Sequence, residues 1–182
     1  MKKNKIILLV CIALMAGIFI TRYIYINNKY PKPIVEEYNL NEPVEYNGFE
    51  ITAKDFQILQ DEDLRELNLD KGILYEDEEM KGMFVTLKVK NVSDETKNIE
   101  TGPFKIATIN WSNGLDLSLF EAINGDNSRA YLELKPGEEV TSVYPYTTIK
   151  SHFDKKGWEQ INSEKFSLVL NLYPVKKSIK LN

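Results

Sequence analysis

The chain has 182 residues, with 23 basic residues (Lys and Arg) against 27 acidic residues (Asp and Glu), and its formal charge is −4. This mild value averages two opposite regions: residues 1–29 hold five basic residues and no acid, whereas residues 30–182 hold 18 basic and 27 acidic residues. A body this acidic argues against binding of nucleic acid, which needs a basic face, and against docking of the domain surface on anionic lipid or anionic wall polymer.

The N-terminal segment has the composition of a membrane helix. Three lysines within residues 1–5 precede an apolar run over residues 6–20, which spans about 22 Å as a helix. Residues 21–26 extend the run to about 31 Å, enough to cross a hydrocarbon core of about 30 Å. Because basic residues flank the N-terminal side, we expect residues 1–5 to form a cytoplasmic tip, residues 6–26 a transmembrane signal anchor, and the remainder to lie outside the cell.

Two alternatives to an uncleaved anchor remain. A cleaved signal peptide would release a secreted domain, but cleavage after Ala16 leaves the large Leu14 at the −3 position, where a small residue is preferred. A lipoprotein modified at Cys11 would have the bulky Val10 before the cysteine. Cys11 is the one cysteine of the chain, so we expect an exported domain that is stabilised by its core without a disulfide.

The remaining residues predict a stalk and one domain. Residues 27–43 are polar and contain two prolines in a Pro-Xaa-Pro sequence, which predicts a stalk without regular structure. Residues 44–182 are long enough for a single domain with its own core. Near their start, alternating apolar residues over 49–53 and 56–58 differ in phase across Lys54 and Asp55, which predicts a bulge or a switch between sheets.

An acidic insert interrupts this pattern over residues 60–82. Residues 61–79 contain nine acidic and two basic residues, a local charge of −7. Leu64 and Leu67 are spaced for a short helical turn. The insert either contacts a partner or only keeps the domain soluble.

The sequence after the acidic insert predicts a series of short strands. The clearest is residues 85–89, where apolar residues alternate with Thr and Lys. Further strands are predicted over 104–111 (closed by a turn at Asn113-Gly114), 115–119, 130–134, 139–149, 166–172 and 175–181, with a turn at Pro136-Gly137 and a short helix over 151–161. Many short strands with little helix predict an all-β fold, an antiparallel β-sandwich preceded by one transmembrane helix.

Known catalytic and cofactor motifs are missing from the sequence. His152 is the one histidine, so a site with two histidine ligands is excluded, and neither a nucleophile elbow nor a glycine-rich phosphate loop occurs. We therefore expect no cofactor and no catalysis. The many carboxylates leave a carboxylate-dependent hydrolase as a remote alternative.

Weak calcium candidates come from the acidic insert. Asp61, Asp63, Glu76 and Asp77 carry oxygen donors of the kind calcium prefers, but their spacing is not that of an EF-hand. The simpler interpretation is a solvated acidic loop.

Partner-binding candidates come from the strand over 139–149 and from the insert. Tyr144 and Tyr146 flank Pro145, which places that strand at a sheet edge, and both rings point to one face. An exposed aromatic pair beside an edge is a partner site, whereas the alternative is that both rings pack in the sandwich. Glu78 and Glu79 are the candidates from the insert.

Two sequence elements carry a resemblance. Residues 81–93 (KGMFVTLKVKNVS) resemble an element G-x-[YF]-V-x-[LV]-x-[VL]-x-N-x-S, and residues 134–140 (LKPGEEV) resemble its companion L-x-P-G-E-x-V. Both are features of bacterial extracytoplasmic immunoglobulin-like families, including the group mislabelled telomeric-repeat-binding-factor-like, which is related to the secreted immunoprotective antigen fold. The resemblance covers roughly residues 44–149. It implies an immunoglobulin-like β-sandwich, which we expect to occupy residues 44–182, and no catalytic residues.

These features together predict a membrane-anchored, extracytoplasmic and non-catalytic domain that binds a protein partner in the cell envelope. The alternatives are a sensor of a small ligand or peptide, or a protective envelope protein, and the carboxylate-dependent hydrolase. A sensor would need an apolar pocket of several hundred Å³.

Overall fold

The computed structural model describes residues 2–125 and 129–182 and divides the chain into two compact units. The first contains helix α1 (Lys2–Lys29), and its segment Lys5–Lys29 is long and apolar enough to cross a membrane, with a mean hydropathy of 2.3. Membrane anchors and signal sequences share this property. The predicted apolar helix is thus present, and residue 1 of the predicted tip lies outside the described residues. The second unit is the domain, Val35–Asn182.

The domain consists mainly of short strands. In chain order its elements are β1 (Ile34–Asn39), β2 (Val44–Tyr46), β3 (Phe49–Leu59), α2 (Asp61–Glu66), β4 (Met80–Asn91), β5 (Lys97–Glu100), β6 (Lys105–Ala107), β7 (Ser112–Gly114), α3 (Leu117–Asn124), β8 (Tyr131–Leu134), β9 (Glu139–Ile149), η2 (Lys150–His152), α4 (Lys155–Gln160), η3 (Ile161–Ser163), β10 (Ser167–Asn171) and β11 (Val175–Lys180). Because three short α-helices accompany the strands, the domain is mostly β rather than all β.

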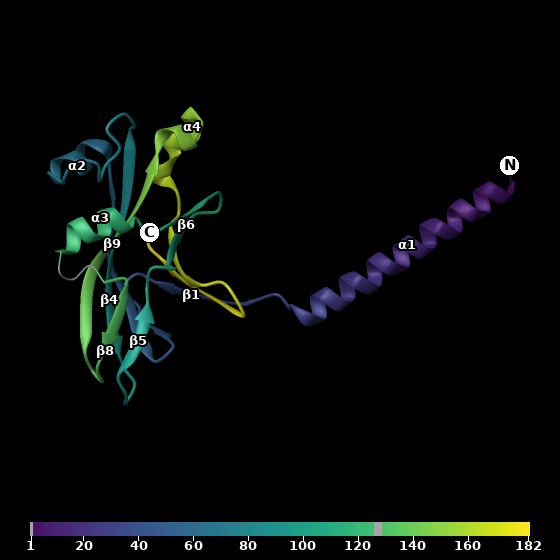
Figure 1. Ribbon diagram of the computed structural model, residues 1–182, viewed down its shortest axis with the longest axis horizontal. Helices are drawn as coiled ribbons and strands as arrows, with labels where there is room; N and C mark the ends of the chain where they lie inside the picture. Colours follow the sequence, from purple (N-terminus) through teal and green to yellow (C-terminus); the bar gives the residue numbers. More distant parts are fainter. Residues whose placement is uncertain (1, 126–128) are drawn as a thin grey trace. The chain divides into compact units, whose positions relative to one another are not determined.

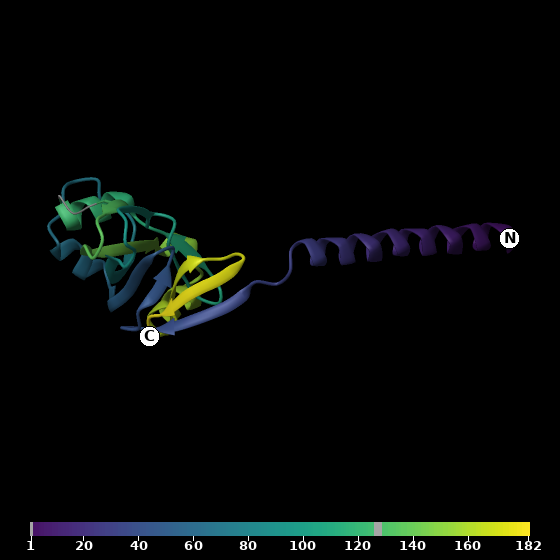
Figure 2. The same cartoon turned by 90° about the horizontal axis from the view of Figure 1, so that it is seen from below.

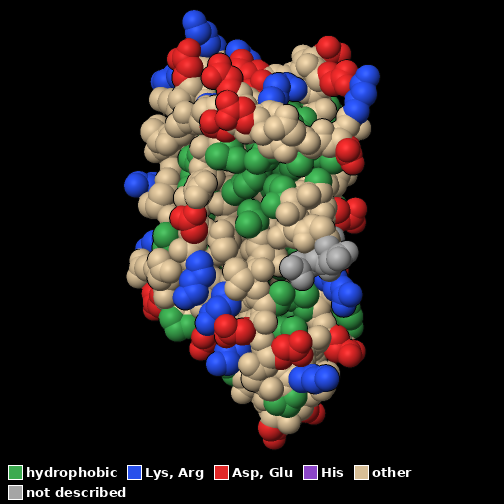
Figure 3. Space-filling model, turned by 90° about the vertical axis from the view of Figure 1, so that its left-hand side faces the viewer, with side chains coloured by type: hydrophobic (Ala, Val, Ile, Leu, Met, Phe, Trp, Pro, Cys, Tyr) green, Lys and Arg blue, Asp and Glu red, His purple; other side chains and the backbone are tan. Residues whose placement is uncertain are grey.

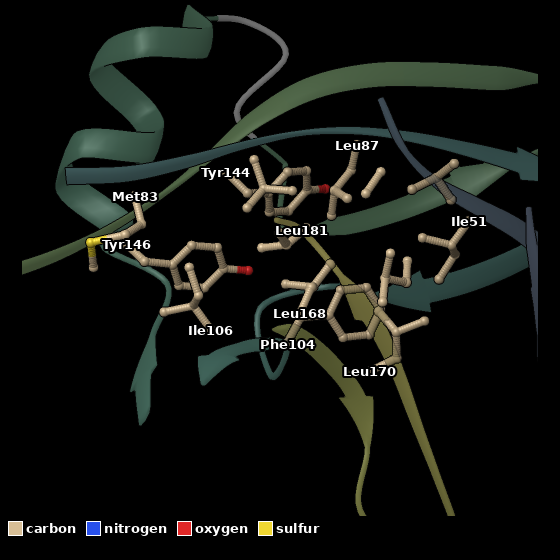
Figure 4. Close-up of a cluster of buried hydrophobic side chains, with 14 of the residues drawn as sticks. Ile51, Met83, Leu87, Phe104, Ile106, Tyr144, Tyr146, Leu168, Leu170 and Leu181 are labelled. Atoms are coloured by element: carbon tan, nitrogen blue, oxygen red, sulfur yellow. The ribbon is translucent and has the colours of Figure 1, made fainter. Parts of the chain in front are cut away.

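Two sheets enclose the core (Figures 1 and 2). One has five strands in the order β1-β11-β10-β6-β7, the other has four in the order β2-β3-β4-β9, and β5 and β8 form a separate pair. Buried side chains of both larger sheets meet in one cluster, among them Ile51 and Leu87 from the four-stranded sheet and Ile106, Leu168 and Leu170 from the five-stranded sheet (Figure 4). The predicted β-sandwich is therefore the architecture of the domain.

Strand β4 is the centre of the four-stranded sheet. It pairs along its length with β3 on one side and with β9 on the other, both antiparallel. The β3–β4 register shifts between Ala53 and Asp55, which confirms the predicted bulge and keeps both halves of β3 in one strand. The alternating pattern of residues 85–89 continues over most of β4, with Val85, Leu87 and Val89 buried.

The end of β4 holds a buried amide, Asn91, which is fully shielded from solvent. Its Nδ2 donates to the carbonyl oxygen of Leu134 (2.7 Å), and its Oδ1 accepts from the N–H (2.9 Å) and the hydroxyl (2.7 Å) of Ser93. Its main-chain N–H donates to Glu138 O (2.9 Å), and its carbonyl accepts from Gly137 N–H (2.9 Å). The amide therefore joins the turn after β4 to the turn between β8 and β9.

These contacts bring the two motif segments, residues 81–93 and 134–140, together. The second contains the predicted turn, in which Glu138 N–H donates to Lys135 O (3.0 Å) and Gly137 has a φ of 77°, a value that favours glycine. The motifs thus describe one structural junction at the end of the sandwich.

The predicted stalk is too long. Residues 34–39 form β1, which pairs with β11 in the five-stranded sheet. The polar sequence is misleading because the carboxylates of β1 have partners: Glu37 pairs with Lys180 (2.9 Å) and Glu36 with Lys177 (3.5 Å). Tyr38 and Leu40 also pack against the core, so the domain begins near residue 34 and not at residue 44.

Two local predictions between β6 and β8 are wrong. The turn lies at Thr108–Trp111, where Thr108 N–H donates to Trp111 O (2.8 Å), and Asn113-Gly114 is part of β7 instead. The predicted strand over 115–119 is the start of α3, because the Asp116 carboxylate accepts from Leu119 N–H (3.1 Å) and caps a helix there.

The Asn91 junction predicts a large stability difference between two asparagine substitutions. Asn91→Ala leaves the buried Leu134 carbonyl without its donor, and we expect a loss of about 3 kcal/mol in the free energy of unfolding. Asn98→Ala, at an exposed position of β5, serves as the control, with an expected change below about 0.5 kcal/mol. Urea unfolding of the full chain in detergent, followed by tryptophan fluorescence, measures both, and equal stabilities would contradict the assigned role.

Candidate functional site

The acidic insert is a folded structure built on α2. The backbone N–H of Gln60 donates to the Asp63 carboxylate (2.8 Å) at the start of this helix, and Leu64 is buried. A β-carbon at Gly82 would lie 2.9 Å from Leu64 Cδ2 and 2.7 Å from the Phe84 ring. Gly82 therefore allows the helix to pack directly on strand β4.

An Asp–Arg pair holds the rest of the insert. The Arg65 guanidinium donates to the Asp61 carboxylate through Nε (2.8 Å) and Nη2 (3.0 Å), and Nη2 also donates to the carbonyl oxygens of Tyr75 (3.1 Å) and Glu78 (3.2 Å). Asp61 accepts in addition from Met80 N–H (3.0 Å). Burial by itself would raise the pKa of Asp61, but the hydrogen bonds from Arg65 and Met80 outweigh it and hold that pKa below its usual value.

The ordered insert and the start of α3 line a common hollow. This hollow, of about 230 Å³, is lined by Ile73, Leu74 and Tyr75 of the insert, by Asp116, which caps α3, and by Ser118 of α3. Tyr75 and Leu117, the residue between Asp116 and Ser118, are 60% and 56% exposed. We call the surface formed by Ile73, Leu74, Tyr75 and Leu117 the insert face.

Charged side chains surround apolar groups on this side of the domain (Figure 3). A second hollow, of about 280 Å³, shares Leu74 and continues over Asp70, Lys71 and Glu76. Glu62, Glu66 and Asp77 are further exposed acids of the insert. Exposed apolar groups within a region of excess negative charge favour contact with a partner that offers apolar and basic groups.

The calcium candidates do not come together. Asp61 binds Arg65, Asp63 caps α2, and Glu76 lies 3.7 Å from Lys71. Asp77 is exposed. Within residues 2–125 and 129–182, no group of three or more acidic, histidine or cysteine side chains could hold a metal ion. Local contacts within the insert hold these carboxylates apart from one another.

The tyrosine pair is not an exposed partner site. Tyr144 and Tyr146 are 1% and 0% exposed, and Figure 4 shows both rings within the core cluster. The Tyr144 hydroxyl lies 3.0 Å from Thr101 Oγ1, and the Tyr146 hydroxyl has no hydrogen-bond partner among the described residues. Burial raises the pKa of both phenols. Side chains two positions apart in a strand lie on the same face, and the face of β9 that carries Tyr144 and Tyr146 covers the core. Both rings therefore point inward.

The edge of the sheet beside these tyrosines is also covered. Strand β9 is an edge strand, as Pro145 predicts, but α3 lies along it. The Asn124 side-chain amide donates to Val143 O (2.8 Å) and accepts from Val143 N–H (2.9 Å), as a neighbouring strand would. Asp116 N–H donates to Pro145 O (3.0 Å), and the Asp116 carboxylate accepts from the Thr147 hydroxyl (2.7 Å). Addition of a partner strand is therefore blocked over residues 143–147.

Glu79 belongs to an intramolecular network and not to the insert face. Its carboxylate pairs with Lys150 and accepts from Trp158 Nε1 (2.8 Å), and the hydrogen bond from Lys150 is the largest cause that lowers the pKa of Glu79. Lys81 is buried beneath Trp158, with Nζ 2.9 Å from the Trp158 carbonyl oxygen and 4.6 Å from the ring centroid. The network ties α4 to β4. Glu78, the other acidic partner candidate, is half-buried.

Another cleft, of about 400 Å³, lies between β8 and the start of β9 and contains three glutamates, Glu133, Glu138 and Glu139. Glu138 accepts from Lys135 N–H (2.9 Å), and Glu139 lies 3.4 Å from Lys88. Two of the three carboxylates therefore have contacts within the fold.

His152 is exposed on η2.

Sequence reasoning missed two residues that build the insert face. By composition Arg65 is only one of two basic residues in an acidic stretch, although an arginine four positions after an aspartate in a short helix is a recognisable pair. Leu117 lies in a segment for which the sequence predicts a strand. No local signal brings α3 beside the insert, since residues 72–75 and 116–118 are far apart in the chain.

Comparisons with known proteins give a family and a fold. A family model described as "Domain of unknown function (DUF5028)" matches residues 33–177. The matched region starts one residue before β1. No curated protein matches the chain.

Among solved structures, a conserved hypothetical protein from Bacillus anthracis has 19% identity and a TM-score of 0.53, with 80% of this chain and 95% of that chain covered. The yjhA protein from Bacillus subtilis has 12% identity and a TM-score of 0.50, with 80% and 99% covered. An uncharacterized β-sandwich protein from Clostridium difficile has 8% identity and a TM-score of 0.47, with 83% and 97% covered. At such identities the two Bacillus structures support the fold alone.

The role of Arg65 predicts that its removal loosens the insert alone. Arg65→Ala removes the donors to Asp61, Tyr75 and Glu78, so we expect faster amide hydrogen exchange over residues 67–79 with little change in β4. Lys71→Ala removes the other basic residue of the insert, whose ion pair is long and exposed, and serves as the control. Hydrogen-exchange mass spectrometry measures both, and unchanged exchange in Arg65→Ala would show that other contacts hold the insert.

Proposed function

Because the chain belongs to the DUF5028 family of domains of unknown function, we propose a function from its own surface: a membrane-anchored, extracytoplasmic and non-catalytic domain that binds a protein partner in the cell envelope. The insert face carries this proposal. It combines exposed apolar groups with acidic side chains of the insert, among them Asp70 and Glu76 of the adjoining hollow, and it is built by specific internal contacts.

Helix α1 supports the membrane part of the proposal. Its apolar segment is long enough to span a bilayer, and the lysines that precede it favour a cytoplasmic N-terminus. The domain then lies on the outer side of the membrane. The alternative is a signal peptide that is removed after export and leaves a secreted domain.

The insert face favours a partner of defined chemistry. Tyr75, which lines the hollow, and Leu117, which lies between two lining residues in the chain, offer exposed apolar area, and the carboxylates of the insert favour lysine and arginine on the partner. Because Arg65 and the packing of α2 order the insert before binding, little entropy is lost when the partner docks. The partner is a protein segment with apolar anchors flanked by basic residues.

The proposed relationship to the extracytoplasmic immunoglobulin-like families rests on the two motif segments that meet at Asn91. The sensor alternative finds less support, since the hollows of the insert face are of about 230 and 280 Å³ and the larger cleft beside β9 is lined by several charged residues. A hydrolase would use that same cleft, where two of the glutamates already have partners.

The mass of the protein extracted from membranes tests the anchor. We expect the intact chain, because cleavage after Ala16 or Thr21 would leave the large Leu14 or Phe19 at the −3 position, where a small residue is preferred. A mature chain that starts near residue 21 would contradict the anchor and favour the secreted form.

Site-specific photo-crosslinking in intact cells tests the partner site. A photoreactive amino acid at Tyr75 is expected to give a reproducible adduct, whereas the same group at Tyr131, equally exposed (59%) on β8, is not. Reversal of charge at Glu62, Glu66 and Asp70 should weaken the Tyr75 adduct if complementary charge guides binding. An equal adduct from both positions, or one indifferent to the charge reversal, would contradict the proposal.

A further inference from the structure

A second exposed apolar surface lies at the start of β1. Strands β1 and β11 run in the same direction: the residues that end them, Asn39 and Leu40 on one side and Lys180 on the other, line a common hollow. Glu36 lies near Lys177 and Glu37 near Lys180, in the same order along both strands. The starts of the two strands therefore also lie together, which brings Ile34 and Val35 beside the turn between β10 and β11. Figure 2 shows β1 and this hairpin side by side.

The residues at this place are apolar and exposed. Ile34 and Val35 are 66% and 57% exposed, and Leu172 and Tyr173 in the β10–β11 turn are 58% and 46% exposed. We call these four residues the tether edge. An isolated exposed leucine needs no explanation, but four large apolar side chains at one end of a small domain indicate that something covers them.

The length of chain between α1 and β1 limits where this edge can lie. Helix α1 ends at Lys29 and β1 begins at Ile34. The five residue-to-residue steps from Lys29 to Ile34 span at most about 17 Å, whatever direction the helix takes. Pro31 and Pro33 restrict the connection further because each fixes its own φ.

We propose that the tether edge docks on the lipid surface of the bilayer in which α1 is anchored, with Ile34, Val35, Leu172 and Tyr173 in the headgroup region. This inference rests on the proposed membrane anchor, since only then does the short connection keep the edge at the membrane. Tyrosine is enriched at such interfaces, and the aliphatic side chains gain by leaving water.

The charge distribution of the domain is compatible with this orientation. The body as a whole is acidic, but Glu36 and Glu37 are paired with lysines, and Lys176 adds positive charge at the start of β11. Figures 1 and 2 show α2 and α3 on the side of the domain away from the β10–β11 turn. Docking through the tether edge therefore leaves the acidic insert face directed away from the membrane.

Depth-dependent fluorescence quenching of the full chain tests the proposal. The protein is labelled with an environment-sensitive dye and reconstituted into phosphatidylcholine vesicles that carry a nitroxide either at the headgroup or deep in the acyl chain. Native Cys11, the one cysteine, reports on α1. In a Cys11→Ala background, Leu172→Cys reports on the tether edge and Tyr131→Cys is the control.

We expect the headgroup nitroxide to quench the dye at position 172 but not the dye at position 131. Quenching of a dye at Val35→Cys should be lost when Leu172 and Tyr173 are both replaced by serine, and near-ultraviolet circular dichroism checks that this variant is folded.

Two failures are distinguishable. If the deep nitroxide quenches the dye on Cys11 but neither nitroxide reaches position 172, the docking proposal is overturned and the anchor stands. If the dye on Cys11 is not quenched, the anchor itself is contradicted. A dye at position 172 that is shielded from aqueous iodide yet unreached by the nitroxides would mean that a protein or a second copy covers the edge, which also overturns docking on lipid.

Discussion

The domain depends on one buried amide. Asn91 ends the central strand β4, and its side chain and main chain together join the β4–β5 turn to the β8–β9 turn. Buried polar groups must be paired, and an asparagine with both donor and acceptor satisfied can pair in one arrangement only. The junction therefore holds the end of β8 and the β8–β9 turn against the end of β4, beside the ladder that pairs β4 with β9 along its length.

The surfaces that favour contact lie outside this sandwich. The insert face is built by α2, the Arg65–Asp61 pair and α3, and the tether edge is formed by the start of β1 and the β10–β11 turn. The helix that contributes to the proposed partner surface also covers the edge of β9, so α3 prevents the addition of a strand over that edge. A rigid sandwich with function on its insertions is common among β domains.

Most strands could be predicted because they alternate. The alternation of Val85, Leu87 and Val89 with polar residues predicts which face of β4 is buried, and the phase change at Lys54 and Asp55 predicts the position of the bulge. The failures arose where long-range contacts override local pattern. The polar residues Glu36 and Glu37 favour a solvated stalk, but in the fold their carboxylates pair with Lys177 and Lys180 of β11. The leucines over 115–119 alternate like a strand, yet the cap at Asp116 and the edge of β9 make the segment helical.

By itself the sequence determined the apolar N-terminal helix, the β-rich body, the position of the acidic insert and the lack of a disulfide in the domain, because composition and periodicity are local properties. Only the tertiary structure decided which aromatic groups are exposed. Alternation shows that Tyr144 and Tyr146 share one face of a strand, but whether that face meets solvent or the opposite sheet depends on contacts between residues far apart in the chain. Likewise, Tyr75 and Ser118 line one hollow only because α3 folds beside the insert.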